Sequence, residues 1–319
     1  MAAIDVSGLV DYVEQNKQDL ISASIIGAPT LTYPIDIITG VKYKENFNFL
    51  AVTAPFQSGS TCAFNASGTT VFTKTELTVV DVKVQNEYCP KELEKKYTQK
   101  FLRPGAHQEE MPLGQYITDL VNKLIAAQME QAIWQGDTAN PGVNNLKHFD
   151  GLVKKVDAAS PVYATATAAV TTTNIIGIID DMYTKLGASI PAIMSRPDLV
   201  LVIGKDTFQK VVLALKALNY FHVEVNQTLQ SWEMTFPWYG LKIVAVDGLS
   251  NIAGTAGAYK DRMFLTYWDN LAFVTDLEND MENIEVWYSK DDRLIKISYE
   301  WKAGTGVKFG AEIVTYKNS

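Results

Sequence analysis

The longest run of helical periodicity in the chain covers residues 112–135. Apolar positions recur at helical spacing in two adjoining rows, the first being Leu113, Ile117, Leu120, Leu124, Ala127 and Gln131, and the second Tyr116, Val121, Ile125, Met129 and Ile133. At about 1.5 Å per residue such a helix is about 36 Å long, so one small domain can cover only part of it. Gly136 suits the position just after a helix C-terminus.

Ahead of this helix, residues 41–88 alternate apolar and polar positions. The stretches "VKYKENFNFLAV" and "TVFTKTELTVVDVKV" have the period of two that is typical of strands, and the segment "TAPFQSGSTCAFNASGT" between them is rich in small residues. The pattern predicts a long, extended hairpin. A lone hairpin is marginally stable in water, and its open edges favour pairing with another chain.

Two shorter helices are predicted in the first third of the chain. Residues 7–22 place Leu9, Val13, Asn16 and Leu20 on one face, with Ser7 available to cap the first turn. Residues 90–102 place Leu93, Tyr97 and Phe101 four apart. Pro29 and Pro34 predict an extended path after the first helix, which has too little apolar surface to fold alone.

After Gly151 the pattern becomes α/β. The stretch "FDGLV" is predicted to begin a strand, residues 173–186 a helix, and "DLVLVIG" and "LKIVAVDGL" two buried strands. Asp206 is expected to cap a helix whose buried face is formed by Phe208, Val211, Val212, Leu215 and Leu218. Alternating helices and buried strands predict a compact α/β unit over about residues 159–250.

The end of the chain is rich in strand patterns. The stretches "RMFLTYW", "NLAFVTD", "NIEVWYS", "RLIKISYEWKAGTGVKF" and "AEIVTY" are separated by polar, turn-like residues. They predict a set of antiparallel strands. The glycine-rich "AGTGVKFG" is interpreted as a turn between strands, because strand-like residues flank it on both sides.

Composition narrows the range of functions. The chain has 319 residues, 47% of them hydrophobic, which is enough for a sizeable core and suggests about two domains. A net charge of −8 argues against tight binding to a nucleic-acid backbone. The N-terminus lacks the basic and apolar regions of a signal peptide. The uncharged residues 158–179 contain Pro161 and several threonines, so no membrane span is expected.

The sequence offers no active site, and we predict no catalytic, cofactor-binding or metal-binding residue. The two cysteines and three histidines are scattered: Cys62, Cys89, His107, His148 and His222. The acidic run of Asp276, Glu278, Asp280, Glu282 and Glu285 lacks the spacing of a calcium loop and suits a solvated face. One alternative stays open around "DTANPGVNN", a turn after the long helix: Asp137 in this turn and Asp150 shortly after it could bind a cation.

The order of these elements resembles the major capsid proteins of tailed double-stranded-DNA phages, which have the Hong Kong 97-type α+β fold. The stretch "QMEQAIWQGD", followed by "HFDGLV", carries the resemblance most specifically. It implies an N-terminal arm (1–38), an extended E-loop hairpin (39–90), a peripheral (P) domain (91–158, with a spine helix at about 112–135), an axial (A) domain (159–252) and closing strands of the P domain (253–319).

The resemblance implies a non-enzymatic virion protein that forms hexamers and pentamers around packaged DNA, without sequence-specific DNA contacts and without a membrane. Assembly in the bacterial cytoplasm, a portal, a scaffold, and decoration or head–tail connector proteins belong to the same expectation. No long N-terminal scaffolding segment is visible ahead of the arm, so both a separate scaffold and cleavage before Met1 are open. Lys74 and Lys83 lie in the predicted hairpin, but no cross-linking is expected.

Three alternatives remain at this point. An encapsulin-like compartment has the same fold but encloses protein cargo. An enzyme could use the α/β unit, with His148 or Asp206 as the residues to test. A monomeric binding module would remain a single small species in solution.

Overall fold

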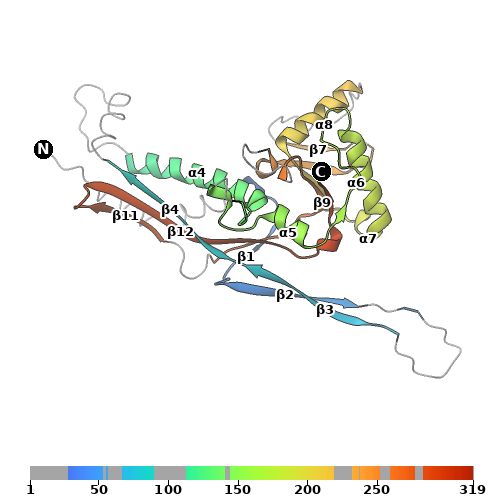
Figure 1. The fold of residues 1–319 in the computed structure, drawn as a ribbon, viewed down its shortest axis with the longest axis horizontal. Helices are drawn as coiled ribbons and strands as arrows, with labels where there is room; N and C mark the ends of the chain where they lie inside the picture. Colours follow the sequence, from blue (N-terminus) through green and yellow to red (C-terminus); the bar gives the residue numbers. More distant parts are fainter. Residues whose placement is uncertain are drawn as a thin grey trace.

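The computed structural model describes residues 28–52, 55–56, 67–89, 113–140, 144–218, 232–236, 238–251, 259–276 and 283–318. Three parts can be followed in Figure 1: a mixed sheet flanked by helices, a long ribbon of strands with one helix along it, and a projecting two-stranded hairpin. The predicted helices at residues 7–22 and 90–102 lie outside the described residues.

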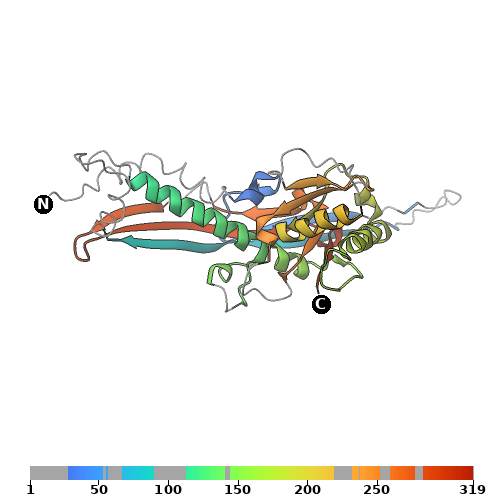
Figure 2. The same cartoon turned by 90° about the horizontal axis from the view of Figure 1, so that it is seen from above.

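The predicted spine helix is confirmed as α4 (Leu113–Gln135). It ends where expected: the Gly136 N–H still donates to the Ala132 carbonyl, but the Asp137 N–H donates to the Leu146 carbonyl outside the helix. A side chain at Gly136 would have its Cβ only 2.4 Å from the carbonyl oxygen of Phe149, so the chain folds back tightly there. Helix α4 runs along the strand ribbon, as the two views in Figures 1 and 2 show.

The ribbon has the long strand β12 (Leu294–Val307) at its centre. It pairs antiparallel with β4 (Val80–Tyr88) and with β11 (Asn283–Ser289). Its last residues pair with β10 (Leu271–Val274), which is parallel to β1 (Asp36–Ile38). Alternate residues of β12 join one buried cluster with α4, namely Ile295, Ile297, Tyr299, Trp301 and Ala303.

The predicted hairpin is formed by β2 (Lys44–Val52) and β3 (Thr70–Thr78), paired antiparallel along their full length. The predicted second strand is divided at Val79, because β4 leaves the hairpin and pairs with β12. Val79 and Leu77 are buried against Val41 and Val274, which fixes the point of division. Residues 80–88, which the resemblance assigned to the E-loop, thus pair in the ribbon.

The predicted α/β unit contains a six-stranded sheet. Its strands in spatial order are β5 (Val162–Tyr163), β13 (Val314–Tyr316), β9 (Met263–Tyr267), β6 (Leu199–Gly204), β8 (Lys242–Val246) and β7 (Glu233–Thr235). The crossover between the parallel strands β6 and β8 contains α8 (Lys205–Ala217). The closing strands are therefore divided between two sheets. Strands β9 and β13 belong to this sheet, and β10, β11 and β12 belong to the ribbon.

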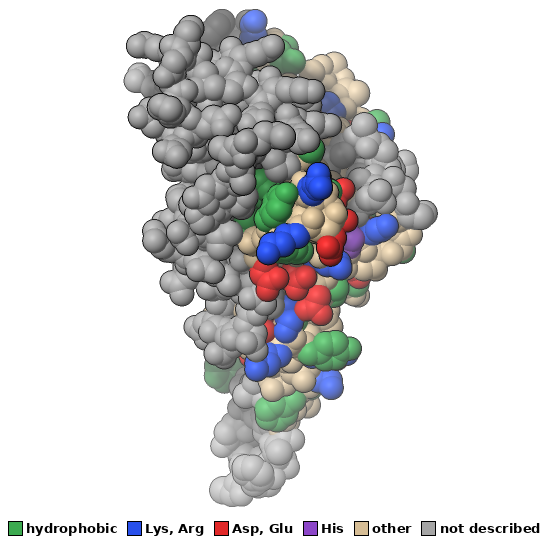
Figure 3. Space-filling model, turned by 90° about the vertical axis from the view of Figure 1, so that its left-hand side faces the viewer, with side chains coloured by type: hydrophobic (Ala, Val, Ile, Leu, Met, Phe, Trp, Pro, Cys, Tyr) green, Lys and Arg blue, Asp and Glu red, His purple; other side chains and the backbone are tan. Residues whose placement is uncertain are grey.

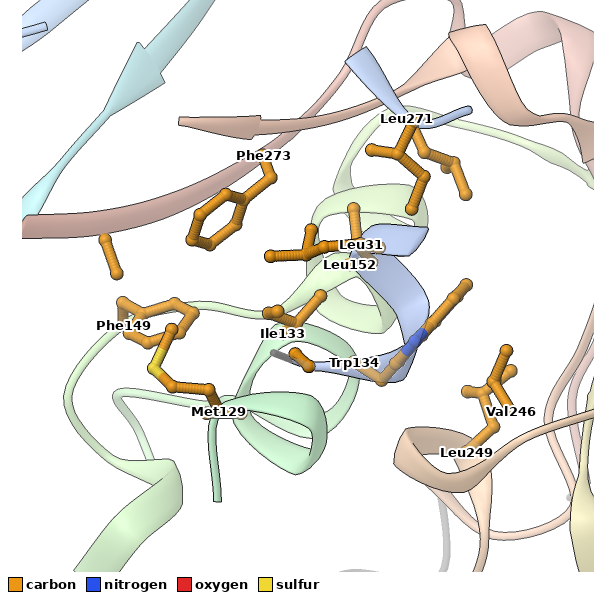
Figure 4. Close-up of a cluster of buried hydrophobic side chains, with 14 of the residues drawn as sticks. Leu31, Met129, Ile133, Trp134, Phe149, Leu152, Val246, Leu249, Leu271 and Phe273 are labelled. Carbon is orange, nitrogen blue, oxygen red and sulfur yellow. The ribbon is translucent and has the colours of Figure 1, made fainter. Parts of the chain in front are cut away.

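The six-stranded sheet is covered on both faces. One face packs against α6 (Ile175–Ser189), α7 (Pro191–Met194) and α8, through residues such as Leu201 and Ile203. The other face joins the cluster around the C-terminal end of α4. Figure 4 shows this cluster, in which Trp134, Leu31 and Leu249 come from three different segments. It joins the sheet to the ribbon.

Two predictions of extended structure are wrong. The stretch "FDGLV" leads into the helix α5 (Leu152–Ala158), in which Leu152, Val153 and Val156 are buried at helical spacing. It is preceded by the turn η3 (Asn144–Leu146). Pro29 begins the 3-10 turn η1 (Pro29–Thr32) instead of an extended segment, because proline suits the first position of a helical turn.

Three finer predictions are also wrong. Asp206 does not cap α8: the N-cap position is Gly204, and Asp206 accepts a hydrogen bond from the Asn251 N–H at 2.9 Å. Of the buried face predicted for α8, Val212 and Leu218 are exposed, while Thr207 and Ala214 are buried. The "AGTGVKFG" stretch is no turn, because β12 continues through it to Val307.

Three further single turns connect the closing strands and the sheet. They are η4 (Asp247–Leu249) after β8, η6 (Trp268–Asn270) between β9 and β10, and η7 (Gly310–Glu312) before β13. No helix among the described residues is long and apolar enough to cross a bilayer.

Candidate assembly surfaces

The hairpin of β2 and β3 presents apolar side chains to solvent. Phe72 is 78% exposed and Val71 is 51% exposed, and they lie on opposite faces of β3 because they are adjacent in the strand. We call this pair the hairpin surface. Nearer the base, Lys44 and Glu76 form an ion pair across the two strands. The hairpin therefore carries exposed apolar side chains beyond this ion pair, and nothing in the described part of the chain covers them.

The base of the hairpin is held firmly against the ribbon. A Cβ atom on Gly304 would lie 2.2 Å from the Thr78 carbonyl oxygen, and one on Gly306 would lie 2.0 Å from Leu77 Cδ2. Only glycine permits this approach of β12 to β3. The hairpin thus projects from an anchored base, as Figure 1 shows.

A second exposed surface lies on α4. The helix buries Val121, Ile125 and Met129 against the ribbon, but Leu124 is 62% exposed and Leu120 is 44% exposed on its outward side. A soluble helix normally turns polar residues outward. The outward side of α4 is therefore a candidate for covering by another segment or chain.

A third surface lies at the turn between β7 and β8. Tyr183 of α6 stacks on Tyr239 with ring centroids 4.1 Å apart, and the Tyr239 hydroxyl donates to Asp180 at 2.9 Å. Trp238, beside Tyr239, is also exposed. These aromatic side chains give the α/β unit an apolar patch at one end of its sheet.

In the turn after α4, a lysine side chain takes the position of a bound cation. The Lys154 ammonium lies 2.7 Å from an oxygen of both Asp137 and Asp150. Thr138 donates its N–H and hydroxyl to Asp150, and the Tyr259 hydroxyl donates to Asp137. The two aspartates proposed as a cation pair are thus brought together, but by a lysine of the same chain that closes the turn.

The protonation states of this cluster agree with a structural role. Burial pushes the pKa of Asp137 and of Asp150 up, but hydrogen bonds, with those from Lys154 the strongest, outweigh burial and lower both pKa values. Burial likewise opposes the charge of Lys154, yet its two aspartate partners raise its pKa. Lys154 therefore remains an ammonium ion at neutral pH and is no nucleophile.

A buried joint connects three segments at the C-terminal end of α4. Glu130 is 1% exposed and accepts hydrogen bonds from the N–H and hydroxyl of Thr30 in η1 and from the N–H of Gly248 in η4. Trp134 Nε1 donates to the Thr30 hydroxyl at 2.8 Å. Burial raises the pKa of Glu130, although the hydrogen bonds from Thr30 and Gly248 oppose the shift. The joint fixes the start of the described chain on the spine helix.

The buried joint around Glu130 was not predicted from the sequence. Glu130 falls between the two apolar rows of the helix and was assigned to neither. The only signal was a carboxylate beside the apolar rows, four residues before Trp134, which indicates no particular partner. Its partners Thr30 and Gly248 are far away in the sequence, so only the fold brings them together.

Except for the aspartate pair of the turn, those of the residues considered for chemistry that the structure describes lie apart from one another. His148 is exposed beside a pocket of only about 80 Å³, and Cys89 is a free thiol. Within the described ranges, no three His, Cys, Asp or Glu side chains lie close enough to hold a metal ion. Asp276 pairs with Lys302, while Cys62, His107, His222, Glu278, Asp280 and Glu282 lie outside the described residues.

Comparison with known proteins gives no match by sequence and clear matches by structure. No protein-family model and no curated protein matches the chain. A chain of the satellite phage P4 procapsid that includes the size determination (Sid) protein superposes with a TM-score of 0.60 at 11% identity, covering 100% of this chain and 92% of that one.

Two other solved structures show the same likeness. A chain of the capsid of Myoviridae phage XM1 has a TM-score of 0.57 at 12% identity, with 92% of each chain covered. A chain from Mycobacterium phage Bobi has a TM-score of 0.56 at 12% identity, covering 100% of this chain and 99% of that one. The chain therefore has the α+β Hong Kong 97-type fold of phage capsid proteins.

Proposed function

We propose that this chain is the structural, non-enzymatic major capsid protein of a tailed double-stranded-DNA phage. In this proposal it forms hexamers and pentamers that close into an icosahedral shell around packaged DNA. The observation that carries the proposal is the exposed hairpin surface on a fold that matches capsid chains along its whole length. Such a hairpin is stable when it lies on a neighbouring copy.

The energetics favour assembly through many modest contacts. Fully burying a side chain such as Val or Phe contributes about 1.5–3 kcal/mol. One chain offers the exposed Val71 and Phe72 on the hairpin and the exposed Trp238 on the α/β unit. In a closed ring each contact is repeated by symmetry, so contacts that are weak singly add up to a stable shell.

The charges suit a container for DNA that does not bind it tightly. On the ribbon, three pairs of opposite charge lie across from one another: Lys83 and Glu300, Asp81 and Lys302, and Glu87 and Lys296. In the face drawn in Figure 3, acidic and basic side chains of the described residues likewise lie side by side. Together with the net charge of −8, this supports a shell that encloses DNA without binding its backbone tightly, and we propose no sequence-specific contacts.

The proposal extends to location and partners. The protein would reside in the virion after assembly in the host bacterial cytoplasm. A portal and a scaffold would act with it, and decoration or head–tail connector proteins could bind the finished shell. Since Lys154 is held by two aspartates, and Lys74 and Lys83 have no distinctive surroundings in the sequence, we expect a shell without lysine cross-links.

The second candidate is an encapsulin-like compartment with protein cargo. The phage capsid structures that match nearly the full chain favour the phage shell. Particles isolated from the natural source separate the two readings. Packaged DNA and a portal at one vertex support the phage shell, whereas a protein cargo and an absence of DNA would contradict it.

Self-assembly is tested by expressing the full chain alone and with its scaffold. Sedimentation velocity should detect rings or closed shells in at least one condition, and negative-stain electron microscopy should show their outline. As a control, the Phe72→Ser and Val71→Ser double variant should remain folded but sediment as small species. A wild-type chain that stays monomeric in both conditions, at micromolar concentration, would overturn the proposal.

A further inference from the structure

The outward side of α4 forms an apolar stripe next to a groove. Leu120, Leu124 and Ala127 follow one another at helical spacing and are all exposed. The groove measures about 580 Å³ and lies between α4 and η4, with Ala127, Lys123 and Pro29 among its lining residues. Ala127 belongs to both the stripe and the groove lining, and we call the two together the α4 groove.

The described chain begins beside this groove. Ala28 is fully buried, and Thr30 is held by Glu130 and Trp134 in the last turns of α4. Pro29 is itself part of the groove lining. Residues 1–27 therefore join the molecule at one end of the α4 groove, and their path starts from a point that the buried joint fixes.

The preceding segment has the chemistry that the groove requires. In residues 7–22 the apolar positions Leu9, Val13 and Leu20 share one helical face. The segment also contains three acidic residues, Asp11, Glu14 and Asp19, against one lysine. The groove contains the exposed Lys123, and its two carboxylates already have partners within the chain, because Glu130 is buried against Thr30 and Asp247 pairs with Lys205 at 2.7 Å. Apolar surface and opposite charge thus match on the two sides.

We propose that residues 7–22 dock as an amphipathic helix in the α4 groove of their own molecule. The lengths allow it. A helix of these residues is about 24 Å long, and residues 23–27 can span up to about 17 Å when extended. The docked helix would cover Leu120 and Leu124 and place an acidic side chain near Lys123. This contact lies within one chain, so it holds whether or not the chain builds a shell.

Disulfide trapping in the full chain tests the docking. In a background with Cys62→Ser and Cys89→Ser, Leu124→Cys is combined in turn with Leu9→Cys, Val13→Cys and Leu20→Cys. Mild oxidation should give an internally linked monomer with at least one of these partners. The matched control is Gln18→Cys, which lies on the opposite face of the predicted helix and should not link.

The alternative outcomes are distinguishable. Equal linking by Gln18→Cys, or no linking by any variant, would overturn the docked helix. A covalent dimer in place of the linked monomer would assign the helix to the groove of a second copy and overturn the intramolecular contact. Non-reducing gels separate the linked monomer from the covalent dimer. The oxidation is carried out on dissociated chains at low concentration, so that collisions between chains are few.

A second variant tests the same contact without new cysteines. Leu124→Asp changes an exposed position, so the fold should survive, which circular dichroism checks. Releasing the segment should make trypsin cleave after Lys17 about tenfold faster, because such cleavage follows the population of the undocked state. Lys216→Asp, in the last turn of α8 and outside the groove lining, is the charge control. An unchanged cleavage rate in Leu124→Asp would contradict the proposal.

Discussion

At the scale of single residues, two glycines of β12 are required because another strand packs very close to them. Gly304 and Gly306 were interpreted from the sequence as part of a turn, because strand-like residues flank them on both sides. In the structure they lie within β12, where a side chain would strike Thr78 or Leu77. The sequence around them gives no sign of the strand that packs against them, so this function of glycine could not be predicted.

Gly304→Ala tests the close approach of β12 to β3. The added methyl group would meet the Thr78 backbone at 2.2 Å, and we expect the free energy of unfolding to fall by about 1–3 kcal/mol. Gly177→Ala, in α6 with no atom within 4 Å of the new methyl group, is the control and should raise it by about 0.5–1 kcal/mol. Urea unfolding followed by circular dichroism measures both. Equal effects would refute the contact.

Glu130 and Asp150 should respond oppositely to pH. The pKa of Glu130 is raised in the folded protein, so the wild type gains stability relative to Glu130→Gln as the pH falls through that folded pKa. The pKa of Asp150 is lowered, so the wild type loses stability relative to Asp150→Asn as the pH falls below the unfolded value.

Unfolding free energies of both variants and the wild type, measured from pH 7 to pH 3, test this pair. Asp150→Asn should also cost about 1–3 kcal/mol at pH 7, because it weakens the contacts with Thr138 and Lys154. Parallel pH profiles for the two variants would show that the buried joint and the turn cluster do not titrate as described.

At the scale of elements, long and regular patterns were predicted well, and short or shared ones were not. The extent of α4 and the antiparallel pairing of β2 with β3 follow from periodicity that continues for many residues. The segment after Gly151 became a helix because Leu152, Val153 and Val156 pack beneath α4 and β12, a tertiary contact that a five-residue pattern cannot reveal.

The hairpin surface is predicted to serve assembly and not folding. Phe72→Ser should leave the free energy of unfolding of the isolated chain within about 0.5 kcal/mol of wild type, since the ring is exposed, but should reduce assembly. Leu77→Ser, buried at the hairpin base, should cost about 2–5 kcal/mol. Unfolding curves and sedimentation profiles compare the two. Normal assembly by Phe72→Ser would mean that the exposed ring is not an assembly contact.

At the scale of the whole molecule, the sequence predicted the class of fold but not how its strands are distributed. The closing strands were expected to form one antiparallel group, yet β9 and β13 extend the six-stranded sheet while β10, β11 and β12 form the other. Strand periodicity tells which residues face a core, but it does not tell which core. The sequence predicted only that the hairpin and the long helix have more apolar surface than one chain covers. Which residues form the exposed surfaces could be seen only in the folded structure.

The central claim is that a second copy of this chain covers the hairpin surface. Cryo-electron microscopy of assembled particles tests it most directly. We expect a closed shell with fivefold and sixfold rings in which Val71 and Phe72 of one subunit lie against its neighbour. A shell in which the hairpins project freely into solvent, or a preparation that contains only monomers, would contradict this account.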